Sequence, residues 1–153
     1  MRRQRPYVLV GLALCLLLAA CGQTTSSSLA PGSSGSVQVT AGASSYQRGD
    51  TISVTIANQG SGDIFAADHQ SQCTIVQLQM QSGNSWRQMG KCAVMTPTRM
   101  HQIGHGASQV VTLTAPNGGW TTGTYRVSLA YSSTQKPGGM MSEAHSAEFQ
   151  VNG

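Results

Sequence analysis

The residues with the most obvious capacity for chemistry are soft metal ligands. The four histidines are His69, His101, His105 and His145. Methionine lies close to two of them, because Met100 precedes His101, and Met140 and Met141 come four to five residues before His145. Imidazole together with thioether sulfur suits copper. The pattern therefore indicates a copper site, or a site for another transition metal, with His101, His145, Met140 and Met141 as its ligands.

Two observations favour a plainer interpretation of the same residues. His101 and His105 have the spacing of two ligands on one helical turn, but the segment HQIGHGAS contains two glycines and leads into a β-type pattern. Residues four apart on an extended strand are about 13 Å apart, which is too far to share one ion. Methionine is also a common filler of protein cores. The alternative is therefore loop histidines, space-filling methionines and no cofactor.

Catalytic patterns are weak in this sequence. Asp68, His69 and Ser71 are the letters of a triad, but triads are assembled from positions that are separated along the chain. The nucleophile turn Gly-x-Ser-x-Gly does not occur, and the five acidic residues form no paired motif. We therefore expect a protein that is not an enzyme.

The N-terminus has the layout of an export signal. Arg2, Arg3 and Arg5 form a basic head, and an uncharged stretch of about 14 residues follows from Tyr7 to Ala20. A membrane-spanning helix needs roughly 20 apolar residues, so a permanent membrane anchor is the less favoured alternative. We expect residues 1–20 to be a signal peptide that is removed.

The cysteine at the end of this stretch predicts where the protein resides. Leu18-Ala19-Ala20-Cys21 resembles the bacterial lipobox, in which a leucine and two small residues precede a cysteine. The resemblance implies that Cys21 receives a diacylglycerol and that cleavage falls just before it. Two acyl chains are enough for stable anchoring. We therefore expect a lipoprotein on the extracytoplasmic face of the cell membrane, in contact with the bilayer through acylated Cys21.

Two cysteines then remain in the exported chain, Cys73 and Cys92. An oxidising compartment favours a disulfide between such a pair, and two free thiols are the alternative. If the segments around them form a hairpin at Ser82-Gly83-Asn84, both residues fall nearly opposite each other, within disulfide reach. The sequence therefore predicts a Cys73–Cys92 disulfide.

The positive net charge of the chain comes largely from the expected signal peptide. The nine lysines and arginines include the three in the basic head, so the exported part keeps six against five acidic residues. Those six are scattered rather than clustered. Binding to nucleic acid needs a clustered basic face, so we expect no nucleic-acid partner.

The exported part divides into a tether and one domain. Residues 21–36 are the lipidated cysteine and a Gly/Ser-rich linker, which could reach about 50 Å when stretched. Residues 37–153 alternate apolar and polar side chains with turn signals between the runs, which is typical of antiparallel strands. We expect an all-β domain of seven to eight strands, near residues 36–42, 51–58, 63–67, 74–81, 85–90, 108–115, 123–132 and 146–151.

The segments YQRGDTISVTIANQG and GTYRVSLAY, with a Cys-led strand and a Gly-x-x-Trp between them, resemble bacterial immunoglobulin-like (Ig-like) domains of exported lipoproteins. The resemblance covers about residues 46–151 and implies an antiparallel β-sandwich. Tyr125 is similar to the tyrosine that begins a late strand of Ig domains, the alternative being an ordinary core aromatic. The sequence departs from antibody domains in having no cysteine in the 51–58 strand or just after Tyr125.

Together these observations predict a binding module for an unknown protein or small-molecule ligand. A sandwich scaffold commonly carries its function on loops. The longest expected loops are residues 67–72, 93–106 and 132–145. The alternatives are a copper- or metal-handling lipoprotein that uses the Met/His residues, and a protease inhibitor that presents residues 95–99.

Overall fold

The computed structural model describes residues 36–68, 74–90, 98–135 and 140–153. These residues form an all-β structure, in which eleven strands and no helix are present. The strands are β1 (Val37–Ala41), β2 (Ser45–Gln47), β3 (Ile52–Asn58), β4 (Ile64–Ala67), β5 (Gln77–Ser82), β6 (Ser85–Met89), β7 (Met100–Ile103), β8 (Ser108–Leu113), β9 (Gly123–Tyr131), β10 (Ser142–His145) and β11 (Phe149–Asn152). In the part of the chain that is described, no helix is long and apolar enough to cross a membrane.

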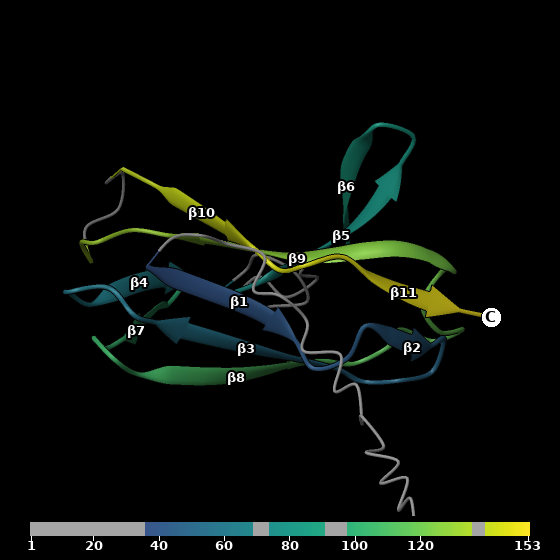
Figure 1. Ribbon diagram of the computed structural model, residues 1–153, viewed down its shortest axis with the longest axis horizontal. Coiled ribbons are helices and arrows are strands. Elements are labelled where there is room, and N and C mark those ends of the chain that lie inside the picture. Colours follow the sequence, from purple (N-terminus) through teal and green to yellow (C-terminus); the bar gives the residue numbers. More distant parts are fainter. Residues whose placement is uncertain (1–35, 69–73, 91–97, 136–139) are drawn as a thin grey trace, which may run out of the picture.

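The strands form three sheets that share one core. One sheet has the order β1-β3-β8, and a larger one has the order β2-β11-β9-β5-β6, with β10 paired to part of β9. A two-stranded ribbon of β4 and β7 completes the fold. Figure 1 shows two layers, with β9, β10 and β11 in one and β3, β7 and β8 in the other, while the β5–β6 hairpin extends away from both.

Alternation along the central strands builds the core. Ile52, Val54 and Ile56 of β3 are buried, and the residues between them are half-buried or exposed. Tyr125, Val127 and Leu129 of β9 are buried in the other layer, and Ser128 between the last two is buried as well. Burial of such side chains contributes about 1.5–3 kcal/mol each. The predicted strands in these two regions are confirmed.

Three strands were not among the seven to eight predicted, namely β2, β7 and β10. Each is three or four residues long. The apolar alternation within them is almost missing, because β2 buries only Tyr46 and β10 only Ala144. The predicted strand count was therefore too low. Two of the three segments expected to be loops, residues 93–106 and 132–145, contain β7 and β10.

The predicted hairpin at Ser82-Gly83-Asn84 is confirmed. β5 and β6 pair from Leu78↔Met89 to Ser82↔Ser85, and Gly83 has a positive φ of 59°. A tight two-residue turn needs this conformation, which glycine adopts readily. Cys73 and Cys92 lie outside the described residues, so their disulfide stays a prediction.

At one end of the domain, Trp120 is hydrogen-bonded to a distant segment of the chain. Its backbone N–H donates to the carbonyl oxygen of Arg48 at 2.7 Å, and its indole N–H donates to that of Asp50 at 2.8 Å. The Arg48 side chain returns a hydrogen bond from Nε to the carbonyl oxygen of Trp120. Gly119 has a φ of 79°, and a Cβ there would lie 2.8 Å from the Arg48 carbonyl oxygen. Only glycine fits this close approach.

At the opposite end of the domain from Trp120, the side chain of Asn58 links two turns. Its side-chain amide donates to the carbonyl oxygens of Gly62, Ile103 and Gly104 at 2.9–3.1 Å, and its Oδ1 accepts from the N–H of Gly60. The residue is 1% exposed. This one side chain therefore joins the β3–β4 turn to the β7–β8 turn.

Candidate functional site

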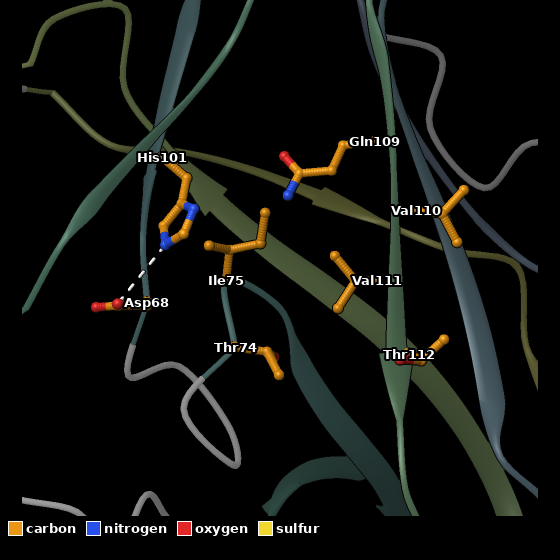
Figure 2. A pocket seen from close by; sticks show the side chains of 8 residues that line it. All are labelled: Asp68, Thr74, Ile75, His101, Gln109, Val110, Val111 and Thr112. Carbon is orange, nitrogen blue, oxygen red and sulfur yellow. Dashed lines mark ion pairs between the residues drawn. The ribbon is translucent and has the colours of Figure 1, made fainter.

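A small pocket lies where the core opens to solvent between the β4–β7 ribbon and β8. It has a volume of about 260 Å³. Figure 2 shows the side chains around it. The lining residues are Asp68, Thr74, Ile75, His101, Gln109, Val110, Val111 and Thr112.

The register of the ribbon brings the two ionisable groups of the pocket together. His101 pairs with Ala66, so Asp68, two residues further on, lies on the same side of the ribbon. That side faces the core, because Ile64, Ala66 and Ile103 on it are buried. His101 Nε2 lies 3.6 Å from Asp68 Oδ2, and the two form an ion pair when the imidazole is protonated.

Asp68 is held firmly by the start of the neighbouring strand. Its Oδ1 accepts a hydrogen bond from the N–H of Arg99 at 2.7 Å, and its own N–H donates to the Arg99 carbonyl oxygen at 2.9 Å. The carboxylate therefore keeps a fixed position at the pocket wall. Its side chain is 17% exposed, whereas that of His101 is 41% exposed.

The opposite wall is largely apolar. Ile75 is buried, and Val111 of β8 packs against the core beside it. Figure 2 shows Gln109 and Val111 directed toward the pocket and Val110 directed away from it. The pocket thus combines an apolar wall with a carboxylate and an imidazole. Pockets for drug-sized ligands commonly have volumes of about 300–1,000 Å³, so this smaller pocket fits a group of about side-chain size.

A second polar group lies on the outer face of the larger sheet. The Ser128 hydroxyl donates to Glu143 Oε1, and Glu143 Oε2 lies 3.8 Å from His145 Nε2. Nearby, the Arg126 guanidinium stacks 4.5 Å above the Trp86 ring. Because Glu143 stands between the serine and the histidine, His145 is not placed to take the serine proton. This is no nucleophilic triad.

Burial is the main cause that lowers the pKa of His145, and the positive charge of Arg126 lowers it further, while Glu143 opposes them. Its Nδ1 is buried, and the described residues offer it no hydrogen-bond partner. Protonation of His145 therefore disfavours the folded state.

This arrangement predicts a pH dependence of stability. The unfolded chain binds the His145 proton more readily than the folded chain, so stability is lost as the pH falls below about 6.5, the usual histidine value. Denaturant unfolding at pH 7.5 and pH 5.0 measures the loss. We expect His145→Gln to lose less stability than wild type over this interval. A His101→Gln control that reduces the loss equally would contradict the assignment to His145.

The predicted metal ligands lie on two different parts of the fold. His101 lies on the β4–β7 ribbon, whereas His145 lies on β10 of the larger sheet. Met140 and Met141 are 94% and 56% exposed, beside β10. Within the described ranges, no group of three or more His, Cys, Asp or Glu residues is arranged to hold a metal. The predicted sites Cys21, Cys73 and Cys92 lie outside those ranges, as do His69 and most of residues 95–99.

The Asp68–His101 pair was missed by sequence reasoning. The sequence patterns place Asp68 beside His69 and Ser71, and they place His101 beside Met100 and His105 and with the predicted ligands His145, Met140 and Met141. The spacing of residues in the sequence does contain evidence for the pair. Asp68 is two residues from Ala66, and His101 is two residues from Ile103. If both segments are strands, each of these two pairs of residues lies on one face of its strand. The pair could be predicted only if β7 was predicted to be a strand, and β7 lacks apolar alternation.

Comparisons with known proteins add little to this description. No family model and no curated protein sequence matches the chain. Among solved structures, it is similar to a β-glucosidase from Listeria innocua in complex with glucose, with 12% identity and a TM-score of 0.35. The same comparison finds the β-glucosidase EmGH1 from Erythrobacter marinus, with 15% identity and a TM-score of 0.29. The matches cover 76% and 77% of this chain but only 16% and 15% of those enzymes. Likeness at this level carries no information about function.

Proposed function

We propose that the chain is an extracytoplasmic lipoprotein, held on a membrane through acylated Cys21, whose Ig-like domain is a binding module. The membrane address rests on Leu18-Ala19-Ala20-Cys21 at the end of an apolar run behind a basic head. The binding role rests on the pocket at the Asp68–His101 pair.

Two features support the Ig-like type. Constant-type Ig domains place their first, second, fourth and fifth strands in one sheet and their third, sixth and seventh in the other. The β1-β3-β8 sheet matches the first, second and fifth of these strands, and the neighbours β11, β9 and β5 of the larger sheet match the other three. The Tyr125 hydroxyl also donates to the Thr121 carbonyl oxygen at 2.6 Å, four residues back along the chain, as in a tyrosine corner.

The observation that carries the binding role is a fixed carboxylate beside an apolar wall, in a pocket to which two of the three segments predicted as working loops contribute one residue each. Asp68 comes from residues 67–72 and His101 from residues 93–106. A group with an apolar stem and a terminal hydrogen-bond donor matches both walls. Charge-assisted hydrogen bonds to a carboxylate are the stronger kind, so a lysine-like amine is the favoured end group.

A chemical-shift titration of the full chain in detergent tests this role. The probes are N-acetyl-lysine amide and its leucine and glutamate counterparts. We expect the lysine probe to shift the amide signals of pocket residues with a Kd of about millimolar, and more strongly than the other two. Asp68→Asn should weaken that binding about tenfold, and the exposed control Glu148→Gln should leave it unchanged. Equal binding of all probes, or equal binding by wild type and Asp68→Asn, would refute the role of the pocket.

A further inference from the structure

The strand beside the pocket is also an exposed sheet edge. β8 pairs with β3 and forms one side of the β1-β3-β8 sheet. The other side, β1, is covered, since every one of its residues is buried or half-buried. Three of the six β8 residues are exposed, and Val110 reaches 63%. Figure 1 shows β8 at the lower rim of the molecule, beyond β3.

The hydrogen bonds of β3 establish which β8 groups face away from the sheet. Asn58 N–H donates to the Ala107 carbonyl oxygen at 2.9 Å, so Ala107 faces β3. Because this direction alternates along a strand, Gln109, Val111 and Leu113 also face β3. On the far side of β3, Gly42 N–H donates to Ser53 O, which fits the same alternation. The N–H and C=O groups of Ser108, Val110 and Thr112 therefore point outward, and within the described residues no strand pairs with them.

The composition of β8 leaves this edge open to pairing. Natural edge strands are usually protected by charged residues, proline or a bulge. The strand reads SQVVTL, with no charge and no proline. It pairs with β3 in an unbroken register over six residues. An uncharged, regular edge of this kind is a template for an added strand.

We propose that this edge pairs with β8 of a second copy of the chain, antiparallel, around a two-fold axis at Val110. The outward groups sit at three alternate positions centred on Val110, so the register on this axis uses all of them. Val110 then faces Val110 of the second copy, and Ser108 faces Thr112 of the second copy. Each such pair exchanges two hydrogen bonds, which makes about six in total.

The exposed side chains on this edge are complementary to themselves. A two-fold axis brings identical residues together, so a charged residue at its centre would repel its own copy. Valine at the centre and hydroxyl side chains on either side avoid that cost. In the two-fold interface each copy uses its own β8 edge. No β8 edge then remains for a third copy, so assembly stops at two copies. The dimer does not depend on the proposed function of the pocket.

Disulfide trapping in the full chain, within membranes of the expressing cells, tests the dimer. Val110→Cys places two thiols at the axis, where paired Cα atoms are about 5.5 Å apart, within disulfide reach. Thr55→Cys is the matched control, because Thr55 pairs with Val110 on the same outer face but one strand inward. We expect Val110→Cys to give a band of twice the monomer mass on a non-reducing gel, at least tenfold stronger than that of Thr55→Cys.

A charge at the axis gives a second measurement. We expect Val110→Lys to raise the dimer dissociation constant at least tenfold in sedimentation experiments on the full chain in detergent, and Thr55→Lys to leave it unchanged. Equal trapping of both cysteine variants, trapping of Val110→Cys to a different protein only, or a wild-type chain that stays monomeric would overturn the proposal.

Discussion

Replacing Asn58 with alanine is expected to lower the free energy of unfolding by about 3 kcal/mol. The Asn58 side chain is buried and makes four hydrogen bonds to the backbone of two turns. Its removal takes the Asn58 donor from the Ile103 carbonyl oxygen in a buried place and takes the acceptor from the Gly60 N–H, and each buried group left unpaired costs about 1–3 kcal/mol. The Gly104 carbonyl oxygen still accepts from the Ala107 N–H. The loss is concentrated where the β3–β4 and β7–β8 turns meet.

Thermal and denaturant unfolding measure this effect. A loss of this size corresponds to a decrease in Tm of roughly 10–20 °C for a domain of this length. Gln59→Ala is the matched control, because Gln59 is adjacent and exposed, and among the described residues its side chain bonds only to Gln38. We expect the control to change stability by less than about 0.5 kcal/mol. A loss below about 1 kcal/mol for Asn58→Ala would mean that the turns hold together without this side chain.

Replacing Cys21 with serine is expected to abolish lipid attachment completely. The serine hydroxyl cannot form the thioether to diacylglycerol that the lipobox resemblance implies. The exported chain is then either released from the membrane or retained with its signal uncleaved. Cell fractionation followed by mass analysis of each fraction distinguishes these outcomes from wild type. Cys15→Ser is the control, because Cys15 lies inside the apolar run and we expect it to leave with the signal. A lipidated Cys21→Ser protein would refute the assignment.

The long strands were predictable because a strand that is buried on one face alternates apolar and polar residues along the sequence. In β3 and β9, isoleucine, valine, leucine and tyrosine recur at every second residue, and those residues form the core. The hairpin between β5 and β6 was predictable for a related reason. Gly83 supplies the positive φ of a tight turn, and the sequence predicts strands on both sides of it.

The candidate site was less predictable, because its strand carries polar residues on the face that points inward. In β7 the core-facing positions are His101 and Ile103, so half of the expected apolar signal is missing. The partner of His101 depends on the pairing of β4 with β7, which joins segments more than thirty residues apart. Local patterns do not determine such a pairing.

Tertiary hydrogen bonds at the two ends of the domain were equally invisible in the sequence. Trp120 meets Arg48 and Asp50 across about seventy residues of chain. Asn58 reads in sequence as an ordinary turn residue before Gly60, and its role in joining two turns follows only from the buried contacts of its side chain. These contacts cannot be predicted from residue type and spacing.

Intact-mass analysis of the protein from its native host tests the central claim, that this is a lipid-anchored exported domain, most directly. The account predicts a mature chain that begins at Cys21, lacks residues 1–20 and carries the added mass of a diacylglyceryl group. It also predicts recovery from the membrane fraction. A mature chain that begins at another residue, carries no lipid and fractionates as a soluble protein would contradict the claim.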